Sequence, residues 1–316
     1  MRGGSMNTRR NAKPRHIGSS AGTSRKSREA AAIGALSLGK GTICRSQVAP
    51  VQVAPMIYHR VIPVLLFDDG AIYRSQEFRW HCRLGDPFEQ LARYKQWDVD
   101  EIIYLDMHRT QGGKRLIEFL PEIARNCFAP LSVGGGIRSL DDIERHFRAG
   151  ADRVVINSVA IDEPDFITAA SHQFGSQAII VSIDAKRRAD GSYEVVTNSG
   201  RSATGRGVVD WALEAARRGA GEIFLNSIDR DGTGAGYDIA LVQSVASKLH
   251  IPVIACGGVG SFEDFAAGIA EAGAGSVAAA NIFCFKELSY LAAKDALAAK
   301  GIAVRRSEVV DKRRWG

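Results

Sequence analysis

The stretch SVGGGIRSLDDIERHFRAG, from Ser132 to Gly150, contains one complete strand–helix unit and decides the fold. An apolar run leads into three glycines. Ser139 then stands where a helix N-cap belongs, with acids in the next turn, and Gly150 stands where the helix should end. The pattern predicts a buried strand, a tight glycine turn and an amphipathic helix in immediate succession.

The same unit recurs eight times after residue 56. Short apolar runs without polar alternation are typical of strands buried on both faces of a parallel sheet. The expected strands are 61–66, 101–106, 130–135, 152–157, 178–184, 222–227, 252–256 and 276–281. Helices are expected between them, among them 86–97, 139–150, 207–219 and 261–273, with Ser261 as a second N-cap and Gly219 and Gly273 as C-caps. Eight units in about 250 residues predict an α/β fold, a (β/α)8 TIM barrel. A doubly wound open sheet is the alternative, but no GxGxxG follows the first strand.

The predicted barrel also repeats internally. EIIYLD at 101 resembles EIFLNS at 222, SVGGGIRS at 132 resembles ACGGVGS at 255, and VIPVLL at 61 resembles IIVSID at 179, with offsets of 121, 123 and 118 residues. Three matches at nearly one period predict two fused half-barrels. The C-terminal ends of the first and fifth strands should then face each other across the barrel mouth.

Charge separates the barrel from the two ends of the chain. Residues 1–55 contain ten Lys and Arg and one acid (net +9), whereas the other 261 of the 316 residues contain 31 basic and 34 acidic ones (net −3). We therefore expect a basic disordered extension over 1–55, a barrel over 56–306 and a basic tail over 307–316. Three interpretations of the extension stay open: a segment upstream of a start at Met56, a transit peptide, or a nucleic-acid-binding tail.

Several classes of protein are excluded by composition. No run of 18 apolar residues indicates a transmembrane helix, and no apolar core indicates a secretory signal, so we expect a cytoplasmic protein. The barrel sequence suggests no basic patch for nucleic acid. The cysteines show no metal-ligand spacing, so we expect free thiols, no metal and no cofactor. They are Cys44, Cys82, Cys127, Cys256 and Cys284.

Glycine runs follow the third and seventh expected strands. Such runs let backbone N–H groups approach an anion closely, and phosphate is the usual anion. Two copies related by the repeat predict two phosphate sites and a substrate with a phosphate at each end. The candidate residues are Gly135, Gly136, Gly257 and Gly258, with Asn157 and Asn281 at the ends of the next strands. Polar strand ends that merely contact solvent are the alternative.

Acidic residues at the strand ends are the candidates for proton transfer. Asp184 ends an apolar strand and should point into the mouth, where a carboxylate can act as general acid or base. Asp106, Asp229 and Asp231 are further acids at strand ends, and the Gly-rich loop 227–238 suits phosphate and ribose contacts. A structural salt bridge is the alternative role for Asp184.

Charged residues also begin four of the strands, at the opposite end of the barrel. Ionisable groups entering a barrel floor are costly unless they are paired. The residues are Arg60, Glu101, Arg153 and Glu222. A stabilising salt-bridge ring and a polar gate are both compatible with them.

Long motifs resemble one family. VGGGIRS, FGSQAIIVSIDAK, GAGEIFLNSIDRDGTGAGYD and the FKE of residues 285–287 are similar to the cyclase subunit of imidazole glycerol phosphate synthase, over about 57–306. The resemblance implies a half-barrel duplication, a heterodimer with a glutaminase docked on the floor, and ammonia passing through the barrel. At the mouth the ammonia would react with a bis-phosphorylated ribulosyl-formimino-aminoimidazole carboxamide ribotide. The products would be imidazole glycerol phosphate and AICAR.

The family's functional residues can be placed on this sequence. The floor gate of the family matches Arg60, Glu101, Arg153 and Glu222. At the position of Arg153 the family more usually has a lysine. Phosphate contacts match Gly136, Asn157, Ser158, Gly232, Gly258 and Asn281. One catalytic aspartate matches Asp184, while Asp106 and Asp231 match supporting polar residues of the mouth.

The family's second catalytic aspartate falls at Leu66, which can neither donate nor accept a proton. A positioned acid or base contributes about 10²–10⁴-fold to rate. Asp68 and Asp69 lie farther along an expected loop and should be displaced by several ångströms. A branch of the family with Leu–Leu at this strand end resembles IPVLL here. Members of that branch look like proteins that work with a glutaminase and an amidotransferase. Together these proteins would transfer nitrogen to sugars of surface polysaccharides.

Three functions therefore stay open from the sequence. The chain passes ammonia to a sugar-amidating partner, or it is a fully active histidine-pathway cyclase, or it is a phosphate-binding barrel without turnover. All three imply a phosphorylated small molecule, no nucleic acid and no membrane.

Overall fold

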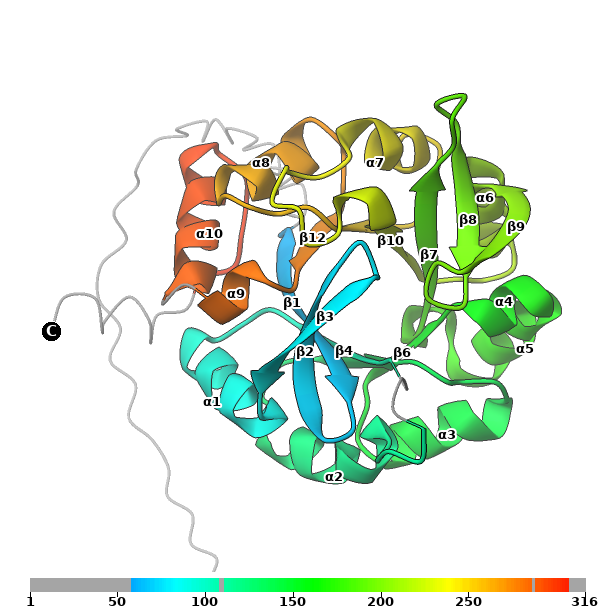
Figure 1. Cartoon of the computed structure of the whole chain (residues 1–316), viewed down its shortest axis with the longest axis horizontal. Helices are drawn as coiled ribbons and strands as arrows, with labels where there is room; N and C mark the ends of the chain where they lie inside the picture. Colours follow the sequence, from blue (N-terminus) through cyan, green and yellow to red (C-terminus); the bar gives the residue numbers. More distant parts are fainter. Residues whose placement is uncertain (1–57, 108–110, 286–287, 307–316) are drawn as a thin grey trace, which may run out of the picture. The chain divides into compact units, whose positions relative to one another are not determined.

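Eight parallel strands close into a barrel in the computed structural model, which describes residues 58–107, 111–285 and 288–306. All of these belong to the second of two units into which the chain divides, Val53–Gly316. The expected extension 1–55, Cys44, the start at Met56, Lys286 and Glu287 of the FKE motif, and the tail 307–316 lie outside the described residues. Figure 1 views the barrel with its helices around the strands.

The barrel strands follow each other around the axis in chain order. They are β1 (Arg60–Asp68), β4 (Ile102–Asp106), β5 (Leu131–Gly134), β6 (Arg153–Ile156), β7 (Ile179–Arg187), β10 (Glu222–Ser227), β11 (Val253–Cys256) and β12 (Ser276–Ala279). The sheet closes because β1 pairs in parallel with both β12 and β4, while β7 pairs with β6 and β10. The predicted TIM barrel is confirmed, and the open doubly wound sheet is excluded.

Helices cover the outer face of the sheet. They are α1 (Pro87–Trp97), α2 (Leu116–Asn126), α3 (Leu140–Arg148), α4 (Ser158–Asp162), α5 (Asp165–Phe174), α6 (Val208–Arg217), α7 (Ile239–Ala246), α8 (Glu263–Ala270), α9 (Ile282–Phe285) and α10 (Ser289–Ala299), with 3-10 turns η1 (Ser176–Ala178) and η2 (Ile228–Arg230). Ser139 caps α3 as predicted, since its side chain accepts from the Asp142 N–H. Ser261 does not cap α8. Phe262 stands at that N-cap, while the Asp264 carboxylate accepts from the Gly260 and Ser261 N–H groups.

Two antiparallel hairpins extend the barrel and were not expected from the sequence. β1 continues through β2 (Ala71–Gln76) and β3 (Trp80–Gly85), and β7 continues through β8 (Tyr193–Thr197) and β9 (Ser202–Gly207). The prediction that Asp68 lies in a loop is therefore wrong, because β1 runs to Asp68 and pairs it with Ala71. The hairpins repeat the half-barrel symmetry, since each follows the first strand of its half.

The apolar core has two parts. The larger part lies between the sheet and the surrounding helices and includes Trp211, Tyr94 and Phe265. The smaller part fills the barrel interior with side chains from alternate strand positions, namely Ile62, Val64, Ile103, Val155, Ile180, Phe224, Ile254, Cys256 and Ala278. The strands are thus buried on both faces, which explains their continuous apolar runs.

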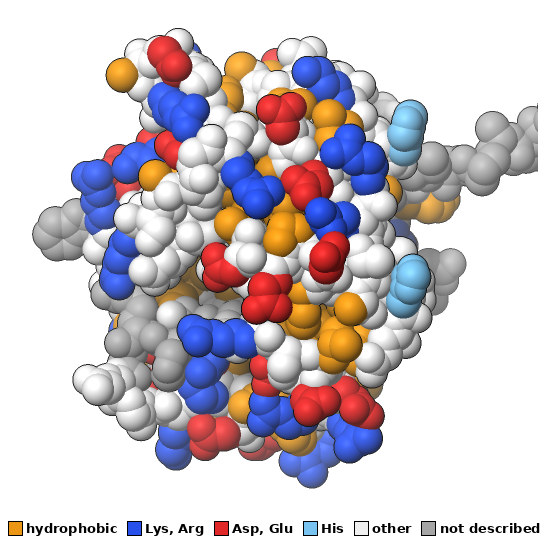
Figure 2. All heavy atoms as spheres, turned by 90° about the vertical axis from the view of Figure 1, so that its right-hand side faces the viewer, with side chains coloured by type: hydrophobic (Ala, Val, Ile, Leu, Met, Phe, Trp, Pro, Cys, Tyr) orange, Lys and Arg blue, Asp and Glu red, His pale blue; other side chains and the backbone are white. Residues whose placement is uncertain are grey.

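The outer surface carries mixed charge. On the face that lies to the right in Figure 1, Lys and Arg side chains alternate with Asp and Glu side chains (Figure 2). No helix within the described part of the chain is long and apolar enough to cross a membrane. No cluster of His, Cys, Asp or Glu within the same residues could hold a metal ion.

Truncating Phe265 should test the packing of the outer core. Phe265 is fully buried on α8, with its ring centroid 5.6 Å from Phe283 and 6.4 Å from Tyr237. We expect Phe265→Ala to lower the free energy of unfolding by about 3–5 kcal/mol in urea denaturation, because it leaves a cavity. Phe128→Ala is the control. Phe128 is 70% exposed with Lys95 over its ring, so its loss should cost less than about 1 kcal/mol. Equal losses in the two variants would contradict this account of the core.

Candidate functional site

The C-terminal ends of the barrel strands bring most of the predicted mouth residues together. Alternation along β7 turns Ile180, Ser182 and Asp184 to the barrel axis, and along β1 it turns Ile62, Val64 and Leu66 to the same axis. Leu66 and Asp184 therefore occupy equivalent places in the two halves. Leu66 packs against the interior apolar cluster, whereas Asp184 is held by polar neighbours.

Asp184 has two amide partners and a raised pKa. It is 8% exposed, and the Nδ2 of Asn157 donates to its Oδ2 at 2.7 Å. Burial raises the pKa of Asp184 to about 7, although hydrogen bonds from Asn157 and Asn226 oppose that rise. Asp231 raises this pKa further by its charge. A carboxyl whose pKa lies near neutrality can both take up and release a proton at physiological pH.

Asn226 is a site residue that the sequence analysis missed. It stands directly beside Asp184 in the β7–β10 register and points to the same axis. The signal was present, because Asn226 follows Glu222 at even spacing along its strand. The register partner of Leu66 on β4 is Leu105, which also packs on the interior cluster. The rim therefore has a polar half around Asp184 and an apolar half around Leu66.

Neither acid near Leu66 takes the place of a carboxylate at that position. Asp69 has a left-handed backbone (φ 44°), and its Oδ1 accepts from the Lys114 N–H at 2.9 Å, which directs it to the loop before α2. Asp68 lies on the same face of β1 as Leu66, two residues farther from the floor, and is buried with an interaction partner. At about 3.3 Å per residue, this offset places Asp68 well beyond the level of Asp184.

The two glycine turns have backbone conformations that favour glycine. Gly135 and Gly136 have φ of 102° and 72°, and Gly257 and Gly258 have φ of 94° and 106°. A Cβ on Gly135 would meet the Asp106 carbonyl oxygen at 2.1 Å, and one on Gly258 would meet the Gly236 carbonyl oxygen at the same distance. These backbones therefore require glycine. Ser158 begins α4 and is exposed, next to Asn157 at the N-cap.

Asp106 does not stand free in the mouth. Its Oδ2 accepts from the Nε of Arg115 at 2.8 Å and from the Leu116 N–H at 3.1 Å, so it joins the end of β4 to the start of α2. Arg115, which the sequence analysis missed, lies against the Gly136 turn, where a Cβ would meet its Nη2 at 2.2 Å. Asp106 thus positions a guanidinium beside one predicted phosphate turn.

Asp231 and Gly232 join the mouth to the β2–β3 hairpin. The Ser75 hydroxyl donates to Asp231 Oδ2 at 2.6 Å, and the Asp231 carbonyl accepts from the Glu77 N–H at 2.9 Å. Burial raises the pKa of Asp231. Asn281 donates to the Ser75 carbonyl at 3.3 Å, so the segments that follow β10 and β12 meet the hairpin, which lies over the mouth (Figure 1). Asp229, by contrast, lies outside the mouth and accepts from the Arg187 N–H.

Several buried amide oxygens of the mouth are available to a ligand. Within the described residues, the Oδ1 atoms of Asn157, Asn226 and Asn281 have no hydrogen-bond partner, although their Nδ2 atoms donate to neighbours. A buried polar atom without a partner is costly. Hydroxyl or N–H groups of a polar ligand would satisfy these acceptors.

The four predicted floor residues form one network. Arg60 pairs with both Glu101 and Glu222, and Arg153 reaches Glu101 at 3.3 Å and Glu222 at 2.5 Å. Glu101 and Glu222 are 1% and 2% exposed. Ser132 donates to Glu101 at 2.6 Å, and Arg60 donates to Ser276 at 3.0 Å. Two guanidinium groups and two carboxylates thus close the N-terminal end of the interior.

The chain is similar in sequence to known proteins. The family model described as histidine biosynthesis protein matches residues 60–289. The imidazole glycerol phosphate synthase subunit HisF of Hyphomonas neptunium is 45% identical over 251 residues, which cover 79% of this chain and 99% of that protein.

The pKa of Asp184 predicts how stability depends on pH. The folded-state pKa, about 7, lies above the ordinary 3.8, so the folded chain binds a proton more tightly than the unfolded chain. Between these values the stability should fall as pH rises, by up to about 1.4 kcal/mol per pH unit. Asp184→Asn removes this dependence. The free energy of unfolding in urea should therefore be compared between the variant and the unsubstituted chain. The difference, variant minus unsubstituted, should be larger at about pH 8 than at about pH 5. A stability difference that does not change with pH would contradict the raised pKa.

Proposed function

This chain belongs to the family of histidine biosynthesis proteins, and from that premise we propose that it is the ammonia-using subunit of a glutaminase-dependent synthase. The observation that carries the proposal is the order of side chains along the barrel axis. A paired charge network lies at the floor, an apolar interior follows, and Asp184 lies between two glycine turns at the mouth.

The floor network suits a gate for ammonia delivered by a HisH-type glutaminase. Arg60 and Arg153 each contact both buried glutamates, so neither carboxylate depends on a single partner. A paired network can exchange partners without leaving a buried charge alone, whereas an unpaired charge would cost several kcal/mol. A docked glutaminase would therefore open the ring by making these arginines and glutamates change partners.

The apolar interior favours neutral ammonia over ammonium. Ile62, Val155 and Phe224 line the axis above the floor with the rest of the interior cluster. Burial in such surroundings disfavours a charged group. A proton would therefore be left at the floor, and the nucleophilic form would reach the mouth.

The mouth suits a substrate with two phosphates. The 135–136 and 257–258 turns lie on strands related by the half-barrel repeat, with Ser158, Gly232, Asn157 and Asn281 as additional contacts. Asp184 lies between them and would transfer a proton during ring formation. In the family's reaction this step yields imidazole glycerol phosphate and AICAR.

Leu66 limits that reaction. A second acid or base on the opposite rim would contribute about 10²–10⁴-fold, and Leu66 and Leu105 provide none. We infer that the histidine-pathway cyclisation is slow in this chain and that the ammonia serves another acceptor, a sugar of a surface polysaccharide amidated by a third protein. The second candidate is a complete histidine-pathway cyclase, which the 45% identity over nearly all of HisF favours.

Glutaminase coupling tests the shared part of both candidates. We expect the purified chain to stimulate glutamate release by the HisH-type glutaminase of the same organism, measured with glutamine as substrate. Tyr58→Asp should weaken the stimulation, because Tyr58 is 54% exposed beside the floor strand β1. The matched control is Leu288→Asp, since Leu288 is 51% exposed but precedes α10 at the mouth end. Absence of any stimulation would reject the ammonia-using role.

Restoring the missing carboxylate tests the role of Leu66. With ammonium and the bis-phosphorylated ribotide, Leu66→Asp should raise the rate of imidazole glycerol phosphate formation by about 10²-fold or more. Leu105→Asp is the control, because it places an acid on the same rim one strand away. Growth of a cyclase-deficient strain on minimal medium gives a second readout. Full complementation by the unsubstituted chain would instead establish the complete cyclase.

A further inference from the structure

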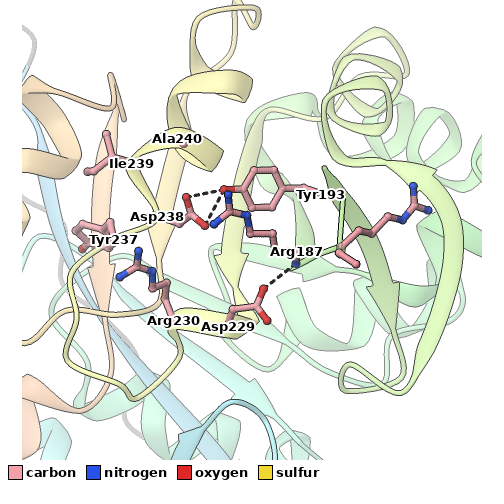
Figure 3. Close-up of a pocket in the computed structure, with 10 residues that line it drawn as sticks. Arg187, Tyr193, Asp229, Arg230, Tyr237, Asp238, Ile239 and Ala240 are labelled. Atoms are coloured by element: carbon pink, nitrogen blue, oxygen red, sulfur yellow. Dashed lines mark hydrogen bonds between the residues drawn. The ribbon is translucent and has the colours of Figure 1, made fainter. Parts of the chain in front are cut away.

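A cavity of about 570 Å³ lies beside the barrel rim, outside the mouth (Figure 3). Its walls are the end of β7, the start of β8, the loop after β10 and the start of α7. The lining residues are Arg187, Arg188, Ala189, Tyr193, Asp229, Arg230, Tyr237, Asp238, Ile239 and Ala240. Asp184 and the four glycines of the mouth are not among them. The cavity therefore has no part in the proposed reaction with ammonia.

Hydrogen bonds fix the walls of the cavity. The Tyr193 hydroxyl donates to both carboxylate oxygens of Asp238, at 2.8 and 2.9 Å. Asp238 also caps α7, since its Oδ1 accepts from the Leu241 N–H at 3.1 Å. Asp229 accepts from the N–H of Arg187, the register partner of Tyr193, at 2.7 Å, which ties the β10 loop to the end of β7. These hydrogen bonds hold together the elements that line the cavity.

Two guanidinium groups in the cavity have no acidic partner. Among the described residues, neither Arg187 nor Arg230 forms an ion pair, and Arg230 donates only to the Ala235 carbonyl at 3.0 Å. Arg188 differs, because it is paired with Glu194 at 3.0 Å. Burial and Asp238 raise the pKa of Tyr193 to about 12, and the charges of Arg187 and Arg230 oppose that rise.

The chemistry of the lining indicates the ligand. Guanidinium groups bind phosphate through parallel N–H donors. A volume of about 570 Å³ is within the range of small-molecule sites and exceeds the needs of a single inorganic anion. The exposed Asp229 carboxylate provides acceptors for hydroxyl groups at the same site.

We propose that this cavity binds a phosphorylated sugar, with Arg187 and Arg230 on the phosphate and Asp229 on the sugar hydroxyls. The site is independent of Leu66 and of the ammonia path.

Calorimetric titration of the full chain with ribose 5-phosphate tests the site. Arg187→Gln should weaken binding at least about tenfold, which is the expected loss of one charge-assisted contact. Arg145→Gln is the control, because Arg145 is an exposed arginine on α3 that contacts only its own helix. Ribose without phosphate should not bind detectably.

The phosphate turns of the mouth could also bind the probe, and a mouth variant separates the two sites. Asn157→Ala removes a contact of the mouth. It should not change the binding of ribose 5-phosphate at the cavity, which Arg187→Gln weakens. The proposal is overturned if Arg187→Gln titrates like the unsubstituted chain, if Asn157→Ala alone abolishes all binding, or if ribose binds as tightly as ribose 5-phosphate.

Discussion

Closure of the parallel sheet is the constraint on which the rest of the molecule depends. β1 must pair with β12 on one side and β4 on the other, so alternate residues of every strand point to a common axis. The side chains around the axis therefore form three levels. Arg60 and its partners lie at the floor, apolar side chains fill the middle, and Asp184 lies at the rim. The function proposed for the chain follows from this order of levels.

The two rims show how the half-barrels have diverged on one scaffold. Asp184 is desolvated but receives hydrogen bonds from Asn157 and Asn226, so a proton can be held or released near neutral pH. The equivalent strand pair presents Leu66 beside Leu105. A carboxylate and a hydrocarbon can occupy equivalent positions because the backbone register, not the side chain, fixes the strand.

The sequence predicted the barrel and the strand ends at which the candidate site residues lie, because apolar runs and glycine turns are local signals. The hairpins were missed because the strands were taken to end at the rim, although Asp69–Gly70 and Asp190–Gly191 are turn-forming pairs 121 residues apart. In the first pair both residues have positive φ. The tie between Asp106 and Arg115, and the cavity around Arg187, could not be predicted, because they depend on side-chain directions between separate loops.

The floor network limits how this barrel can be taken apart or recombined. Glu101 and Glu222 are equivalent residues of the two halves, and Arg60 contacts both of them. A first half produced alone would leave Arg60 without Glu222, and a second half would leave Glu222 buried without a guanidinium. Chimaeras that exchange one half with a relative should therefore fold only where the incoming half supplies the matching charge at this seam.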